Sequence, residues 1–193
     1  LESSPGWHLY HTVAVNYAFC LQHLPGRLPE AISIYSALSR TRNKPAEYYV
    51  NYSLALLASH DWEEARSICN RGLAHYPDDL DILGNNTIAL RCLCDLPAAQ
   101  ESAMRRLALR RDVHSLEEAA SVVGAQKDRA RDADFPEAIR LAKLEYSLIQ
   151  EALRLNPRYG VVRIYEIQLL RFAKHTGKVI DACQAVMDDT QFH

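Results

Sequence analysis

The sequence predicts an all-α fold, a right-handed α-solenoid of about five antiparallel helix pairs. Three observations predict it. Only 7 glycines and 8 prolines occur among 193 residues, and helix-favouring alanine, leucine, arginine and glutamate are abundant. Apolar residues between these breakers recur at helical spacing, as at Ala65, Ile68 and Cys69. Similar turn-and-helix segments also recur every 34 residues, marked by Ala31, Ala65 and Ala99.

Composition and charge exclude several other classes of protein. A hydrophobic fraction of 48% with 24% charged residues is ordinary for a globular protein, and the formal charge of −2 gives no bias toward nucleic acid or anionic membrane. The apolar run from Val13 to Leu21 is interrupted by Asn16, so no membrane-spanning helix is predicted. Residues 1–6 lack a signal-peptide pattern and an initiator methionine. We therefore expect a cytoplasmic piece of a larger intracellular protein.

The predicted organisation is a linker-like segment, residues 1–8, followed by one helical domain over residues 9–190. The first repeat, residues 12–44, contains a turn at Leu24-Pro25-Gly26 and a second helix that starts at Leu28-Pro29. Proline is tolerated there because the first turn of a helix leaves its N–H groups unpaired.

The next two repeats have the same design. Residues 45–78 contain a helix from Ala46, a turn at Ser59-His60-Asp61, and a second helix that the proline of Tyr76-Pro77 ends. Residues 79–111 open on Asp78-Asp79, which can cap the first turn, and their second helix starts near Pro97.

Two more degenerate repeats are expected over residues 112–157 and 158–190. Ser115-x-x-Glu118 is typical of a capping box that opens a helix. The charged stretch 126–134 interrupts the period and is interpreted as a flexible solvated loop. A turn and helix start at residues 134–138 lead into a long helix over 136–155. A last pair is expected over 161–174 and 179–187.

The second repeat carries a family resemblance. The segment Ala46-Glu47-Tyr48-Tyr49-Val50-Asn51-Tyr52-Ser53-Leu54-Ala55-Leu56, with Asp61-Trp62-Glu63-Glu64-Ala65 and Pro77, resembles the tetratricopeptide repeat (TPR) family. The resemblance is clear over residues 12–111 and extends to about residue 190. It implies small residues where helices cross and large ones that fill the gaps. The small contacts would be Ser53, Ala65 and Gly72, and the fillers Tyr49, Tyr52, Leu56 and Cys69.

The same resemblance implies a binding groove lined by the first helix of each pair. Asn16, Asn51 and Asn85 occupy one slot in three successive repeats, and some TPR proteins hold a peptide backbone with asparagines there. A carboxamide suits this task because it both donates and accepts. The alternative is that these asparagines cap or bridge neighbouring helices. Helical spacing adds apolar groove residues, which could instead pack against neighbouring helices: Val15, Phe19, Val50, Leu54, Leu57 and Ile88.

Other charged residues do not indicate a second kind of site. The TPR proteins that clamp a C-terminal carboxylate use basic residues beside the asparagines, where this chain has Thr12, Val15, Phe19 and Asp81. A carboxylate clamp is therefore not expected. The basic run 105–111 is interpreted as a solvated helix end, since leucines rather than aromatic residues alternate with its arginines.

No catalytic, metal-binding or cofactor-binding pattern is present, and the five cysteines are interpreted as reduced. The sequence therefore predicts a non-enzymatic protein–protein interaction module that binds a peptide or helix of a partner, with no membrane or nucleic-acid partner. One alternative is a regulatory or sensor region of a multidomain signalling enzyme, such as a bacterial kinase or NTPase, in contact with its own catalytic domain. A self-associating scaffold is another.

Overall fold

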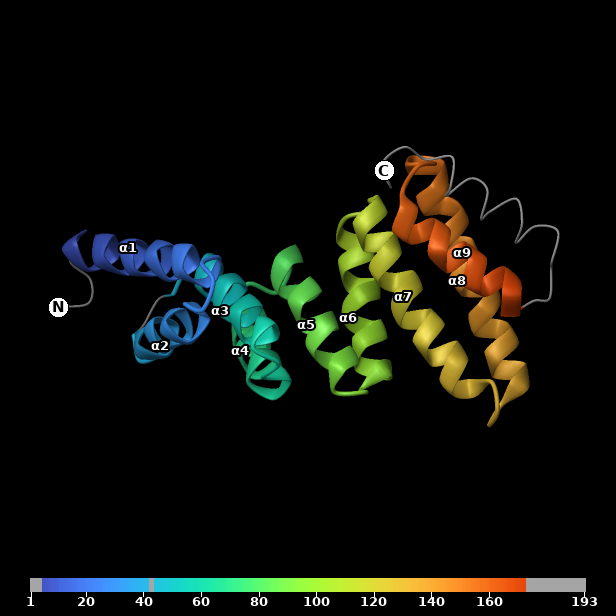
Figure 1. The fold of residues 1–193 in the computed structure, drawn as a ribbon, viewed down its shortest axis with the longest axis horizontal. Coiled ribbons are helices and arrows are strands. Elements are labelled where there is room, and N and C mark those ends of the chain that lie inside the picture. Colours follow the sequence, from blue (N-terminus) through green and yellow to red (C-terminus); the bar gives the residue numbers. More distant parts are fainter. Residues whose placement is uncertain (1–4, 42–43, 173–193) are drawn as a thin grey trace. The chain divides into compact units, whose positions relative to one another are not determined.

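The computed structural model describes residues 5–41 and 44–172, and every regular element in these ranges is an α-helix (Figure 1). This confirms the predicted all-α class. Within the described ranges, no helix is both long enough and apolar enough to cross a lipid bilayer. The helices are α1 Pro5–Gln22, α2 Leu28–Leu38, α3 Ala46–Ala58, α4 Trp62–His75, α5 Leu80–Cys92, α6 Leu96–Leu109, α7 Val113–Ala130, α8 Phe135–Leu155 and α9 Gly160–Phe172.

The chain divides into two compact units, Leu1–Asp95 with α1 to α5 and Leu96–His193 with α6 to α9. The division falls inside the segment 79–111, which was expected to be one repeat. In the first unit α1 packs on α2 and α3 on α4, and α3 also packs on both α1 and α5. In the second unit α7 packs against α6, α8 and α9. The first helices of successive pairs therefore lie next to one another within each unit.

Aspartate caps begin four of the described helices. The carboxylates of Asp79 and Asp134 accept backbone N–H groups at 2.9 Å and 3.1 Å, which confirms the helix starts predicted there. Asp61 caps α4 in the same way. The predicted capping box at Ser115 is wrong, because the carboxylate of Asp112 caps α7 and accepts the Ser115 N–H at 2.8 Å. Ser115 itself is buried in the first turn.

Several helix boundaries lie next to prolines. Pro29 lies in the first turn of α2, and α4 and α8 end just before Pro77 and Pro157. At the N-terminal end α1 already begins at Pro5, inside the segment expected to be linker-like.

The expected loop at residues 126–134 is largely helical, because α7 runs to Ala130 and α8 begins at Phe135. Two inward contacts explain the correction. The Gln126 amide donates to the Leu96 carbonyl at 3.0 Å, and the Lys127 ammonium lies 2.8 Å from a Glu145 carboxylate oxygen. The helix expected over 179–187 lies outside the described residues.

Three turns repeat one backbone conformation. Gly26, His60 and Cys94 stand 34 residues apart and have φ of 74°, 64° and 59°. This left-handed conformation favours glycine, because a Cβ atom crowds the neighbouring carbonyl there. Among these three turns, only the first has glycine at this position. His60 and Cys94 therefore adopt a backbone conformation that is unfavourable for residues with a side chain.

We expect Cys94→Gly to stabilise the chain by about 0.5–1 kcal/mol, because it relieves this backbone strain. Urea denaturation followed by circular dichroism measures the change. Cys92→Gly, two residues earlier at the end of α5, is the matched control and should destabilise by a similar amount. Equal effects of the two substitutions would contradict the argument.

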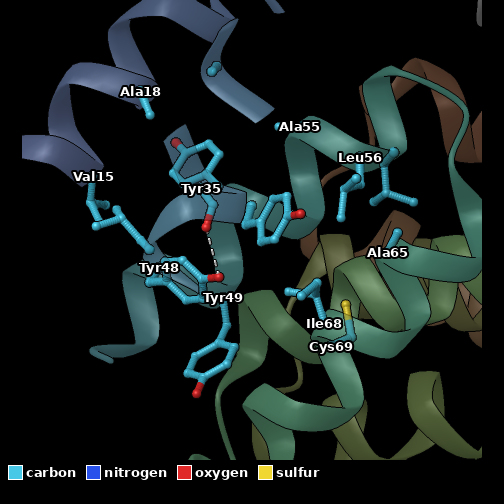
Figure 2. Packing of buried hydrophobic residues seen from close by; sticks show 14 of the residues in the cluster. Val15, Ala18, Tyr35, Tyr48, Tyr49, Ala55, Leu56, Ala65, Ile68 and Cys69 are labelled. Atoms are coloured by element: carbon cyan, nitrogen blue, oxygen red, sulfur yellow. Dashed lines mark hydrogen bonds between the residues drawn. The ribbon is translucent and has the colours of Figure 1, made fainter. Parts of the chain in front are cut away.

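The core of the first unit is built from tyrosines set against small residues (Figure 2). Tyr35 and Tyr48 are fully buried, and the Tyr48 hydroxyl donates to the Tyr35 carbonyl at 3.1 Å, which joins α3 to α2. Gly72 is required for close approach, since a methyl group there would lie 2.9 Å from the Tyr49 Cβ. Burial raises the pKa of the Cys69 thiol to about 12, so this filler stays protonated.

Every small contact and filler expected in the second repeat is buried. They are Ser53, Ala65, Gly72, Tyr49, Tyr52, Leu56 and Cys69.

Candidate functional site

One slot carries an exposed apolar side chain on three helices of the first unit. Leu54 and Ile88 are each the ninth residue of their helix, α3 and α5, and Phe19 holds the equivalent place in α1. The three side chains are exposed to nearly the same extent, 40% for Phe19, 39% for Leu54 and 41% for Ile88. Single exposed apolar residues are ordinary, but their recurrence at one slot of three adjacent helices is a pattern. We call these three residues the apolar row.

The predicted asparagines lie three positions before the apolar row, on the same faces of the helices. Asn16 is exposed and Asn51 is half-buried. Asn85 differs, because its amide donates to the Val50 carbonyl at 3.0 Å and to the Ser53 hydroxyl at 2.9 Å. At this position the asparagine bridges α5 to α3, as the alternative interpretation expected.

Not every expected groove residue is exposed. Val50 is half-buried, whereas Leu57 and Val15 are only 7% and 3% exposed and belong to the core of the unit. The expectation that Leu57 and Val15 line an open surface therefore needs correction, since their positions on α3 and α1 turn them toward the packed helices. The residues that share the open face are Asn16, Phe19, Asn51, Leu54 and Ile88.

The second unit has a cavity at the corresponding slot. Ser121 and Gln168, each the ninth residue of its helix, α7 and α9, both line it. Its volume is about 570 Å³. Polar and charged residues dominate the lining: Ser121, Lys127, Asp128, Arg131, Glu145, Tyr165, Gln168 and Arg171, with Gly124, Ala125 and Phe172.

A buried ion pair lines part of this cavity. The side chains of Lys127 and Glu145 are 4% and 5% exposed, and their charged atoms lie 2.8 Å apart. Gly124 makes the room, because a Cβ there would lie 2.7 Å from a Glu145 carboxylate oxygen. The Phe172 ring centroid lies 5.2 Å from the Lys127 ammonium. Burial raises the pKa of the Glu145 carboxyl, an effect that the hydrogen bond and charge of Lys127 oppose.

Sequence reasoning missed this pair, although a signal was present. Glu145 is the eleventh residue of α8, and Gly72 is the eleventh residue of α4. A glutamate at the position where another repeat requires glycine indicates that the facing helix has a small residue opposite it. Here that residue is Gly124 of α7.

The cavity wall offers cationic donors to a ligand. Lys127 is compensated by Glu145, while Arg131 lies 3.6 Å from the highly exposed Asp132, and Arg171 also lines the space. Guanidinium groups bind carboxylates through paired hydrogen bonds, and amide and hydroxyl groups pair with a peptide backbone. The arrangement therefore suits the polar part of a polypeptide segment.

The basic run 105–111 is engaged within its own unit. Arg106 pairs with Glu118 of α7, and Arg111 forms a two-pronged ion pair with Glu151 of α8, one contact measuring 2.7 Å. Arg110 lies 3.2 Å from Asp112. Arg106 and Arg111 therefore join helices, while Arg110 and Arg111 remain largely exposed just after the C-terminal end of α6.

Comparison with known proteins shows a structural likeness without a close sequence relative. No protein-family model matches the chain, and no curated protein matches it either. A thermophilic TPR protein, TTC0263 from Thermus thermophilus, has a TM-score of 0.66 and 16% identity, and the match covers 76% of this chain and 75% of that one.

Two other solved structures match over more of the chain. MamA residues 41 to the end from Desulfovibrio magneticus RS-1 has a TM-score of 0.76 and 13% identity, with 95% of this chain and 96% of that chain covered. YrrB, described as a TPR protein with an unusual peptide-binding site, has a TM-score of 0.69 and 13% identity, with 93% and 86% covered. Together with the observed helix pairs, these matches show that the chain has a TPR-like fold over most of its length.

Proposed function

We propose that this chain is a non-catalytic protein-interaction module that binds an extended peptide or a helix of a partner protein. The observation that carries the proposal is the apolar row, whose three side chains present nearly equal exposed fractions on adjacent helices. A regular apolar row can receive side chains that recur along an extended or helical segment.

The neighbouring asparagines suit the backbone of such a segment. Asn16 and Asn51 lie on the same faces as the row, and a carboxamide can pair with both the N–H and the C=O of a peptide. Asn85 already donates to α3, so its role in binding is limited to its remaining acceptor capacity. In the second unit, the polar cavity offers arginine, glutamine and tyrosine side chains to a segment of the same kind. The unusual peptide-binding site of YrrB supports the proposal by analogy.

The test begins with random twelve-residue peptides displayed on phage and selected against the full chain. A selected peptide is then labelled, and its dissociation constant is measured by fluorescence anisotropy. We expect Ile88→Glu to weaken binding at least tenfold, because the substitution places a solvated charge in an apolar contact. Asn16→Ala combined with Asn51→Ala should weaken it about threefold to tenfold through lost hydrogen bonds.

Ile139→Glu is the matched control. Ile139 is 39% exposed on α8, against 41% for Ile88 on α5, so both variants make the same chemical change at nearly equal exposure. The control should bind the peptide as the unmodified chain does. Equal affinity of the Ile88→Glu variant, or failure to select any peptide, would refute the assignment of binding to this face.

A further inference from the structure

A second apolar surface lies on α1, away from the apolar row. Tyr10, Val13 and Tyr17 are 60%, 57% and 52% exposed, and Leu24, directly after the helix, is 51% exposed. Together with the exposed Cys20 they are spaced alternately three and four residues apart. That spacing places them along one seam of the helix, as at the contact positions of paired helices. We call these five residues the α1 seam.

The positions of α3 and α5 that are equivalent to the α1 seam pack against other helices. The residue of α3 equivalent to Val13 is Tyr48, which is 0% exposed and bonds to α2 of the preceding pair. Ile82 holds that place in α5 and is also 0% exposed. The residue equivalent to Tyr17 in α3 is Tyr52, which is 5% exposed. Positions that pack against another helix elsewhere in the chain are therefore open on α1.

The other residues that hold the places of Cys20 and Tyr17 in later first helices are buried in the same way. They are Ala55 at 1%, Ala89 at 0% and Val122 at 0% for Cys20, and Asn86 at 7% and Ala119 at 1% for Tyr17.

The charge pattern indicates which occupant the seam accepts. The segment from Pro5 to Gln22 contains no aspartate, glutamate, lysine or arginine. Two copies of α1 can therefore approach without like-charge repulsion, and neither copy has to desolvate a charge on the helix. Arg27, which interacts with the Tyr17 side chain, is paired with Glu30 at 2.6 Å.

The exposed area is sufficient for a weak dimer. Aromatic side chains bury roughly 150–250 Å² each, so the half-exposed tyrosines, with Val13 and Leu24, offer on the order of 500 Å² per copy. Both copies together reach about 1,000 Å², an area typical of weak or transient interfaces. We propose that the α1 seam is a dimer interface, at which α1 of one copy packs on α1 of a second copy of this chain.

Sedimentation velocity of the full chain over a dilution series, from about 1 μM to about 300 μM, tests the proposal. The unmodified chain should move from its monomer mass of 21.9 kDa toward twice that value as concentration rises. The double variant Val13→Glu and Tyr17→Glu places four carboxylates in a symmetric interface, and should raise the dissociation constant at least about 100-fold. Tyr146→Glu is the matched control, because Tyr146 is 43% exposed on α8, and should dimerise normally.

Hydrogen exchange of the unmodified chain provides a measurement that does not depend on the variants folding. Amides of α1 should exchange more slowly at high than at low concentration, while those of α4 should not change. A monomer mass throughout the series would overturn the proposal, and would indicate that the α1 seam contacts a helix other than α1 of a second copy. A dimer that persists in the double variant, or one without concentration-dependent protection of α1, would overturn it as well.

Discussion

Lys127→Met should destabilise the folded chain by about 3–5 kcal/mol at pH 8. The substitution removes one partner of a buried ion pair and leaves the Glu145 carboxylate without compensation. Met has a similar length and no charge, so packing changes little. Denaturation in urea, followed by circular dichroism, gives the free energy of unfolding. An exposed lysine on α8, Lys143, supplies the control, and Lys143→Met should change stability by less than about 0.5 kcal/mol.

The penalty for Lys127→Met should depend on pH in a defined direction. Burial already raises the pKa of Glu145 above its ordinary value of 4.5, and Lys127 opposes the rise, so its removal raises that pKa further. The folded protein then holds a proton that the unfolded chain releases. The contribution of the protonated Glu145 carboxyl to stability is therefore fully present below the pKa that this group has in the unfolded chain. It is lost as the pH rises through the higher pKa of the folded protein. The difference from the unmodified chain should be smallest near pH 4.5 and largest near pH 8.

A second substitution separates charge from packing. In the double variant Lys127→Met and Glu145→Gln, no unpaired charge remains, and most of the lost stability should return. The pH dependence of the difference should vanish as well. A penalty that stayed constant between pH 5 and pH 8 in the single variant would show that the pair contributes by shape alone.

Tyr48→Ala should lower the free energy of unfolding by about 3–5 kcal/mol, as much as Lys127→Met. Tyr48 of α3 is fully buried beside Tyr35 and Tyr49 (Figure 2), and its ring also lies near that of Tyr52. Removing its ring leaves a cavity that the surrounding helices cannot fill. Thermal and urea denaturation report the loss.

Tyr48→Phe isolates the hydroxyl from the ring. It removes the hydrogen bond to the Tyr35 carbonyl and should cost only about 1 kcal/mol. Tyr146→Ala, at a half-exposed tyrosine of α8, should cost less than about 1 kcal/mol. If Tyr48→Ala were no worse than Tyr146→Ala, the tyrosine cluster would not be the core of the first unit.

Helix boundaries were the most predictable part of this chain. Pro77 and Pro157 mark helix ends, and Asp79 and Asp134 mark helix starts, because capping and chain-breaking act within one turn of backbone. Where a second candidate cap stood nearby, as Ser115 does beside Asp112, local pattern alone chose the wrong one.

The candidate site was predictable only in part. The shared slot of Asn16, Asn51 and Asn85 and the faces they occupy follow from helical periodicity. The packing of α3 and α5 decides the rest. It brings the Asn85 amide within hydrogen-bond distance of α3, and it buries Leu57 in the core. Periodicity gives the face of a residue, while burial depends on which helix covers that face.

The sequence by itself determined the repeat length and the turns at residues 24–26 and 59–61, because chain-breaking and turn formation are local requirements of backbone geometry. Only the tertiary structure showed that residues 126–130 remain helical, that Lys127 meets Glu145 eighteen positions later, and that the α1 seam is left open. Those outcomes depend on contacts between helices. Their energies come from desolvation and packing, and neither can be evaluated until the neighbouring helix is in place.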